Sequence, residues 1–293
     1  MIALIYNPNS GGFRAETLEK LQQMLKDRQL DHRLYPTERA GHASELAARA
    51  VDDGADTLAC YGGDGTTYEV LNGLPDPAAV TLLLIPCGTG NDLLRTLRLP
   101  RDACRALQLQ LDGEACPMDL VQVNEKRYLN VAGIGLDVAV LSEYALLRGR
   151  GFGNFAYKMA VFRAMHRFRP MHLSLRLDSG DAQAVNCSML SIGNGKYIGG
   201  GMCCVPAADP FDGALDGIIV RPVSNWLIAL LLPLFFIGKH IHLSLVRTMR
   251  AQTLEIHADE PFWMQMDGEL SEMQHANIRI LPGGVRLRLP KSH

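Results

Sequence analysis

The chain has 293 residues, 47% of them hydrophobic, and its 29 basic and 31 acidic residues give a formal net charge of −2 at pH 7. This balance provides no broad positive field, so we expect no nucleic-acid partner. The seven cysteines include no Cys-x-x-Cys pair and fit neither a zinc site nor a disulfide framework. The apolar N-terminus has no positive segment before it, which argues against an export signal. We therefore expect a folded cytoplasmic protein with two domains or one large one.

The first 119 residues alternate apolar runs with helical spacing. Strands are predicted at residues 2–6, 32–35, 55–61 and 80–85, each followed by a loop or turn and then a helix. This alternation is typical of a parallel sheet covered by helices on both faces. In such folds, ligands bind at the carboxyl ends of the strands. We expect an α/β nucleotide-binding domain over residues 1–119.

Short loops follow the first two predicted strands. The first loop reads Asn7, Pro8, Asn9, Ser10 and Gly11. Asn-Pro and Ser-Gly are also common in ordinary turns, so composition alone does not distinguish a nucleotide-binding loop from a turn. Thr37 follows the second strand, where it either caps the next helix or contacts a nucleotide.

The third strand turns sharply into a helix. The turn reads Gly62, Gly63, Asp64, Gly65 and Thr66. Glycines let the backbone approach a ligand closely, and the N–H groups of a helix start can face an anion. A carboxylate such as Asp64 tolerates a phosphate beside it only when a cation or a substrate hydroxyl lies between them. The alternative is a tight turn in which Asp64 or Thr66 caps the helix.

A second glycine-rich turn follows the strand at residues 80–85. It contains Gly88, Thr89, Gly90, Asn91 and Asp92, with Arg95 about one helical turn later. Arg95 is either a phosphate clamp or a solvated helix cation. Two such turns in one chain are more specific for a phosphate site than either turn alone.

After residue 119 the pattern changes from strand–helix units to hairpins. Further strands are predicted at residues 120–123, 127–134, 171–177, 185–192 and 218–220. Residues 254–257 and 262–266 predict another hairpin, ended by Asp267, Gly268 and Glu269, and residues 278–281 and 285–289 predict two more strands. We expect a mainly antiparallel β-sandwich domain over residues 120–275 and a C-terminal segment, 276–293, that returns toward the first domain.

Two stretches of the second half have competing interpretations. Residues 206–217 hold three carboxylates, but Asp-Gly turns link strands in many proteins. Residues 226–237 are the most hydrophobic stretch and are too short to span a bilayer, which takes about twenty residues. They form either a buried core helix or an exposed apolar cap that dips into a membrane surface.

Five motifs together resemble the soluble diacylglycerol kinase family of bacterial lipid kinases. Residues 7–11 resemble its Asn-Pro-x-Ser-Gly loop, and residues 62–66 resemble a Gly-Gly-Asp-Gly-Thr signature that sphingosine-type and NAD kinases share. Residues 88–95 resemble a second block of the family that NAD kinases do not carry at this place. Residues 130–137 and 267–269 resemble the start of its lipid-binding domain and its closing acidic turn.

The resemblance implies an ATP-dependent lipid kinase in which Mg²⁺ bridges the phosphates and ATP lies between the domains. The residues that would hold the nucleotide are Asn7, Pro8, Asn9, Ser10, Gly11, Thr37, Gly62, Gly63, Asp64, Gly65, Thr66, Thr89 and Arg95. Asp64 and Asp92 would organise the metal and the acceptor, and Arg95 would neutralise developing charge. One residue of the acidic pair Asp267 and Glu269 would be the base, with Asp267 favoured for proximity.

The same resemblance implies a structural magnesium in the turn of residues 209–216. Its ligands would be Asp209, Asp212 and the carbonyl of Ala214, with Asp216 as an outer neighbour. The expected acceptor is a diacylglycerol-like lipid at a membrane surface. This implies a protein that associates transiently with membranes without spanning them, and a homodimer is compatible with that role.

Two other functional classes compete with this interpretation. An NAD kinase would share residues 62–66 but is disfavoured by the block at 88–95 and by the apolar run at 226–237. A non-catalytic lipid-binding regulator would more naturally have lost Asp64 or the acidic pair at residues 267 and 269, and all three carboxylates are present.

Overall fold

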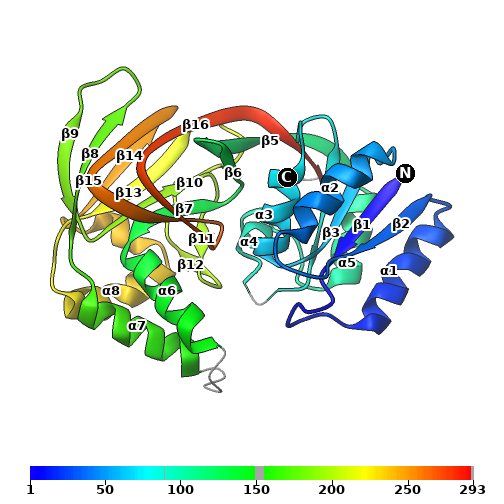
Figure 1. Cartoon of the computed structure of the whole chain (residues 1–293), viewed down its shortest axis with the longest axis horizontal. Coiled ribbons are helices and arrows are strands. Elements are labelled where there is room, and N and C mark those ends of the chain that lie inside the picture. Colours follow the sequence, from blue (N-terminus) through cyan, green and yellow to red (C-terminus); the bar gives the residue numbers. More distant parts are fainter. Residues whose placement is uncertain (89, 149–154, 292–293) are drawn as a thin grey trace.

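The computed structural model describes residues 1–88, 90–148 and 155–291, which form two lobes (Figure 1). The N-terminal lobe contains β1 (Ile2–Tyr6), α1 (Ala15–Asp27), β2 (His32–Pro36), α2 (His42–Asp52), β3 (Thr57–Gly62), α3 (Asp64–Gly73), β4 (Thr81–Pro86), α4 (Asp92–Thr96) and α5 (Ala103–Leu111). Its strands pair in parallel in the order β4-β3-β1-β2. The predicted parallel sheet is confirmed.

Helices cover both faces of this sheet. Successive residues of a strand face opposite sides, and β3 shows this clearly. Leu58 joins a core cluster with apolar side chains of α2 and α3, whereas Ala59 joins a second cluster with α1 and α5. Because β3 is buried on both faces, its carboxyl end at Gly62 is firmly placed in the middle of the sheet edge.

The C-terminal lobe is built mainly of antiparallel strands with three α-helices beside them (Figure 1). Its elements are β5 (Glu114–Val123), β6 (Lys126–Tyr128), β7 (Val131–Gly135), α6 (Leu136–Arg148), α7 (Phe155–Arg167), β8 (Met171–Leu177), β9 (Gln183–Cys187), β10 (Met189–Gly193), β11 (Tyr197–Ile198), β12 (Met202–Cys203), β13 (Leu215–Val220), α8 (Asn225–Phe236), η1 (Lys239–His242), β14 (Val246–Ala251), β15 (Thr253–Met266) and β16 (Glu269–Leu289). The central strand order is β14-β13-β10-β7-β15-β16. The predicted mixed α/β class, with a parallel N-terminal sheet and antiparallel C-terminal strands, is confirmed.

The strand β16 extends through both lobes (Figure 1). Its first half pairs antiparallel with β15, and both halves pair with β5. Near its end, Arg286 and Leu287 pair in parallel with Thr81 and Leu82 of β4. The two lobes therefore share one hydrogen-bonded sheet.

Two predicted strands are each divided in the structure. Residues 127–134 lie in β6 and β7, and residues 185–192 lie in β9 and β10, which have different partner strands.

Two pairs of predicted strands are, conversely, single strands. The runs at 254–257 and 262–266 are not a hairpin but one strand, β15, with a register shift between His257 and Phe262. The runs at 278–281 and 285–289 likewise belong to β16, with a shift between Leu281 and Val285. Polar residues and proline interrupt the first apolar pattern, and Pro-Gly-Gly interrupts the second. In both places the backbone continues as a bulge, which accommodates residues that leave the ladder.

Candidate functional site

The predicted nucleotide loops all lie at the carboxyl edge of the parallel sheet. The loop of residues 7–11 follows β1 and is tied to the end of β4, because Ser10 Oγ donates to the Cys87 carbonyl at 2.9 Å. Thr37 follows β2, is buried, and its backbone N–H donates to the Tyr6 carbonyl at 2.9 Å. Residues 62–66 follow β3 and the turn that begins at Gly88 follows β4. Thr89 lies outside the described residues.

Glycine is required where the two glycine-rich turns meet. A Cβ on Gly88 would lie 2.7 Å from the Gly63 Cα, so a side chain there would push the turns apart. A Cβ on Gly62 would collide with the Thr66 side chain, which fills the space beside it. The turns therefore pack backbone against backbone, and N–H groups at the start of α3 lie at their junction.

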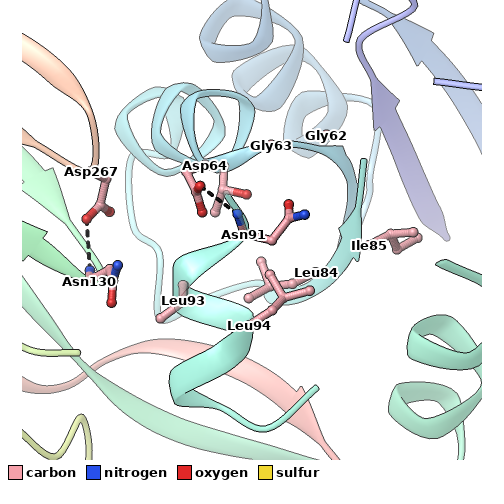
Figure 2. A pocket seen from close by; sticks show the side chains of 11 residues that line it. Gly62, Gly63, Asp64, Leu84, Ile85, Asn91, Leu93, Leu94, Asn130 and Asp267 are labelled. Carbon is pink, nitrogen blue, oxygen red and sulfur yellow. Dashed lines mark hydrogen bonds between the residues drawn. The ribbon is translucent and has the colours of Figure 1, made fainter. Parts of the chain in front are cut away.

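Asp64 joins the two turns (Figure 2). Its Oδ2 accepts a hydrogen bond from the Asn91 backbone N–H at 2.9 Å. Asn91 has a left-handed φ of 51°, and its side chain forms hydrogen bonds with the N–H and the carbonyl of Gly88. The amide of Asn91 thus holds its own turn closed, while its N–H orients Asp64.

The carboxylates of Asp64 and Asp92 converge on Gly90. A Cβ on Gly90 would lie 2.8 Å from Asp64 Oδ2 and 3.7 Å from Asp92 Oδ2. Burial and then the charge of Asp92 raise the pKa of Asp64 to about 6, and burial raises the pKa of Asp92. Asp92 Oδ2 accepts from the Gly200 N–H at 2.8 Å, whereas its Oδ1 is buried and has no hydrogen-bond partner in the part of the chain that the structure describes.

This pair fits a divalent cation of the kind that kinases use. Two buried, mutually repelling carboxylates gain from a shared cation, and Mg²⁺ typically takes one or two carboxylates together with substrate phosphates and water. Among the described residues, no group of three or more His, Cys, Asp and Glu side chains is arranged to hold a metal without such extra ligands. Asp64 and Asp92 are therefore the residues that would hold magnesium together with a nucleotide.

Arg95 lies on α4 beside the Gly-rich loop that follows β10. Its guanidinium lies 5.5 Å from the centre of the Tyr197 ring, and one Nη donates weakly to the Gly200 carbonyl at 3.4 Å. Its Nε is buried, and no described residue forms a hydrogen bond with it. The guanidinium has donors left for an anion next to Asp92, as a phosphate clamp requires.

Asp267 is held by three backbone donors from the segment before β7. The N–H of Leu129 donates to one carboxylate oxygen at 2.8 Å, and those of Asn130 and Val131 donate to the other, each at 3.0 Å. Figure 2 shows the bond from Asn130. These bonds favour the charged form, but burial dominates and, with the charge of Asp64, raises the pKa of Asp267 to about 7. Asp267 and Gly268, both with positive φ, form the two-residue turn between β15 and β16.

Glu269, the first residue of β16, lies on the other side of the same turn. A Cβ on Gly65 would lie 3.1 Å from Glu269 Oε1, so this carboxylate faces the first turn of α3. Burial and then the charge of Glu69 raise the pKa of Glu269. The structure thus brings Asp64, Asp92, Asp267 and Glu269 to one place between the lobes.

A cavity of about 500 Å³ extends from the acidic cluster into the C-terminal lobe. Its polar end includes Asp64, Asp92 and Asp267, and the rest of its wall is largely apolar. The apolar lining comes from α6, α7, α8 and neighbouring strands: Leu136, Val140, Leu141, Val161, Met165, Met189, Ile198, Met202, Val220, Leu232, Phe235 and Phe236. The sequence interpretation missed this wall. The spacing of Leu136, Val140 and Tyr144 along α6 was the available signal, since it predicts one apolar face.

The turn of residues 209–216 is organised around an arginine. Arg250 donates to Asp212 at 2.7 Å and to Asp216 at 3.0 Å, and Asp209 accepts from the backbone N–H of Phe211. Burial raises the pKa of Asp216, and Arg250 opposes this. Two of the three carboxylates are thus already paired with a cation, which does not favour a magnesium ion here. The structural magnesium at Asp209, Asp212 and Ala214 stays a prediction.

Two protein-family models together match most of the chain. The family described as "Diacylglycerol kinase catalytic domain" matches residues 1–123, and "YegS C-terminal NAD kinase beta sandwich-like domain" matches residues 130–289. A diacylglycerol kinase from Mycobacterium tuberculosis is 30% identical over 298 residues, which cover 99% of this chain and 95% of that protein. A probable lipid kinase, YegS-like, from Pseudomonas aeruginosa is 32% identical over 85% of this chain and 82% of its own length.

Solved structures share the fold. The crystal structure of a diacylglycerol kinase from Bacillus anthracis superposes with a TM-score of 0.75 at 23% identity, covering 98% of this chain and 96% of that one. An NAD kinase from Archaeoglobus fulgidus, solved in complex with ATP, superposes with a TM-score of 0.56 at 13% identity, covering 98% and 93%. At these identities the likeness shows the fold alone.

Proposed function

The chain belongs to the family of diacylglycerol kinases and YegS-like lipid kinases, and from this premise we propose that it transfers the γ-phosphoryl group of ATP to a hydroxyl group of a lipid. One observation carries the proposal. The carboxylates of Asp64, Asp92 and Asp267 lie at the polar end of a largely apolar cavity, and Glu269 lies beside them at the first turn of α3, so a lipid chain in the cavity would present its hydroxyl to this cluster. A soluble dinucleotide acceptor would find an apolar wall instead.

On the nucleotide side, the backbone turns do most of the binding. The N–H groups at the start of α3 and the two packed glycine turns would receive the phosphates, while Arg95 would contact the transferred group. Mg²⁺ held by Asp64 and Asp92 would neutralise charge on the phosphates. The loop of residues 7–11 and Thr37 lie along the same sheet edge, where the remainder of the nucleotide would lie.

On the acceptor side, one carboxylate of the acidic pair would take the proton of the lipid hydroxyl. Three N–H donors occupy the oxygens of Asp267, so protonation would cost hydrogen bonds. Glu269 faces Gly65 and carries no such set of backbone donors. We therefore now favour Glu269 as the base and Asp267 as the residue that positions the turn, which reverses the preference taken from the sequence.

The helix α8 suggests how the lipid arrives. Trp226, Leu230 and Ile237 are 61%, 75% and 62% exposed, whereas Leu232 and Phe236 of the same segment line the cavity. Trp226 also contacts the half-exposed ring of Phe162 on α7. An apolar surface continuous with an apolar cavity suits a membrane from which a lipid is extracted. No helix among the described residues is long and apolar enough to cross a bilayer.

We place this activity at the cytoplasmic membrane surface, where ATP is available. A homodimer stays a prediction.

The decisive experiment incubates the full-length protein with labelled ATP and magnesium, and supplies either a lipid extract in mixed micelles or NAD. We expect label in the organic phase. Label on NAD would replace the proposal with an NAD kinase, and label on neither acceptor would favour a non-catalytic lipid-binding protein.

A further inference from the structure

The cavity contains a polar pair apart from the four clustered carboxylates. Asp137, in the first turn of α6, and Gln265, on β15, both line it. Gln265 is buried, and its Nε2 donates to Asp137 Oδ2 at 3.4 Å. Its Oε1 accepts from the Gly268 N–H at 3.0 Å, so Gln265 connects Asp137 to the turn that carries Asp267. The pair therefore lies next to the place where the acceptor hydroxyl would react.

The fold leaves room for the Asp137 carboxylate. Gly133 of β7 pairs with Gln265 of β15 across the sheet. A Cβ on Gly133 would collide with Asp137 Oδ2 and would lie 3.2 Å from Gln265 Nε2. Any larger residue at position 133 would displace the carboxylate. Glycine at this position thus preserves the contact between Asp137 and Gln265.

Asp137 has an unsatisfied acceptor. Its Oδ1 is inaccessible to solvent and has no hydrogen-bond partner among the described residues. Burial raises the pKa of Asp137 to about 6, while the backbone N–H groups at the N-terminal end of α6 and the Gln265 amide favour its charged form. An ionised carboxylate only accepts hydrogen bonds, and a buried acceptor without a donor is costly. What is missing beside Oδ1 is a hydrogen-bond donor.

We propose that Asp137 and Gln265 recognise a hydrogen-bond donor of the lipid, either a free hydroxyl or an ammonium group. This donor is on the carbon adjacent to the one that bears the phosphoryl-accepting hydroxyl. This rests on the proposed lipid kinase activity and narrows its substrate. The ester groups of a diacylglycerol offer only acceptors and would leave the carboxylate unpaired. A monoacylglycerol or a long-chain amino diol supplies the donor. The preferred acceptor is therefore a lipid with a free donor beside its reactive hydroxyl, and not a diacylglycerol.

The test compares matched acceptors in mixed micelles with the full-length protein, ATP and magnesium. The first pair is 1-monooleoylglycerol and its 2-O-methyl ether, in which a methyl group replaces the donor hydrogen; the added bulk is the same in every variant. Dioleoylglycerol and sphinganine complete the set, and sphinganine distinguishes an ammonium from a hydroxyl donor. We expect kcat/KM to be about ten- to a hundredfold higher for 1-monooleoylglycerol than for its ether, the range for a hydrogen bond to a charged group.

Variants assign the preference to Asp137. In Asp137→Asn we expect the ratio between 1-monooleoylglycerol and its ether to fall by about tenfold or more, with the KM for ATP unchanged. Asp181→Asn, an exposed carboxylate between β8 and β9, is the control and should keep the wild-type ratio. A purely structural role of Asp137 would lower both rates equally and leave the ratio intact.

Several outcomes would overturn the proposal. Equal rates on 1-monooleoylglycerol and its ether, or a preference for dioleoylglycerol, would do so with the wild-type protein alone, even if Asp137→Asn fails to fold. An unchanged ratio in a folded Asp137→Asn would remove this residue from recognition. Absence of phosphoryl transfer to all four lipids would instead refute the kinase activity itself, a separate result from a wrong acceptor preference.

Discussion

The nucleotide side and the lipid side of the site are built differently. On the nucleotide side, the predicted residues that the structure describes lie in short loops or short helices directly after parallel strands, and backbone groups hold the two glycine-rich turns together. On the lipid side, side chains from α6, α7, α8 and several strands meet around one cavity. Substitutions on the nucleotide side should therefore lower kcat by large factors. Substitutions on the lipid side should change acceptor preference and membrane binding by smaller factors.

Replacing Asp64 should have the largest effect. In Asp64→Asn, kcat should fall by about 10²–10³, since the Mg²⁺ proposed at the transferring phosphoryl would lose one of its two carboxylates. The same change should stabilise the fold above pH 6 by about 2–3 kcal/mol, because the pKa of Asp64 is raised to about 6 from its usual 3.8. Steady-state kinetics and thermal unfolding without nucleotide or magnesium measure the two effects.

The pH dependence of this stability has a definite sign. A carboxyl whose pKa is raised on folding favours the folded state below its unfolded pKa, and that contribution is lost as the pH rises to the folded pKa. The advantage of Asp64→Asn over the wild type should therefore be absent near pH 3.5, grow between about pH 4 and 6, and stay constant above. A lower melting temperature for the variant at pH 8 would contradict the repulsion between Asp64 and Asp92.

Substitutions in the acidic turn should give the next largest effects, and those of Glu269 and Asp267 should differ in kind. Glu269→Gln should lower kcat by about 10²–10⁴ with little change in the KM for ATP, as for loss of a general base. Asp267→Asn should mainly disturb the turn, since an amide nitrogen cannot accept the hydrogen bond that one carboxylate oxygen accepts, although removing a carboxylate whose pKa burial raises to about 7 offsets part of the lost stability. Loss of turnover in a fully stable Asp267→Asn, with a normal rate for Glu269→Gln, would restore Asp267 as the base.

The membrane surface should respond to changes at exposed residues of α8. Trp226→Ser with Leu230→Ser should weaken sedimentation with vesicles by about tenfold or more, since burial of each such side chain is worth roughly 1.5–3 kcal/mol. Activity on a short-chain, water-soluble acceptor should be unchanged. Phe235→Ser is the contrasting variant, because Phe235 is buried and stacks on His240 at 4.0 Å, so its loss should lower the melting temperature. Unaltered vesicle binding in the double variant would remove α8 from the membrane contact.

The smallest effect should come from the turn at residues 209–216. Asp212→Ala should lower the free energy of unfolding by about 1 kcal/mol, because the ion pair between Asp212 and the half-exposed Arg250 is lost. If the turn also binds magnesium, EDTA should lower the melting temperature of the wild type and leave that of the variant unchanged. If EDTA changes the melting temperature of neither protein, the turn is held by its ion pairs alone.

The difference between the two sides also explains what the sequence could predict. The glycine-rich turns are local, so Asp64, Asn91 and Asp92 could be found from residue types and spacing after a strand. The cavity is non-local. Gln265 and Asp137 are 128 residues apart in the sequence and meet only because β7 and β15 pair.

The sequence predicted some strand boundaries wrongly and left the exposed face of α8 undecided, for related reasons. Pro261 and the Pro-Gly-Gly run at 282–284 look like turns because they break the apolar pattern, yet pairing with long neighbouring strands carries the backbone through them. The run at 226–237 is apolar on all sides, so its sequence could not show that Phe235 would be buried and Leu230 exposed.

The course of β16 has a consequence for how the protein unfolds. The carboxylate of Asp119 on β5 accepts hydrogen bonds from the N–H of Gly283, at the bulge of β16, and from the N–H of Gly213, in the turn before β13. One side chain therefore stabilises the junction between the lobes. A strand that is hydrogen-bonded into both lobes cannot detach from one without disturbing the other. We expect the lobes to melt together in a single calorimetric transition, and any opening movement to pivot at the glycines of that bulge.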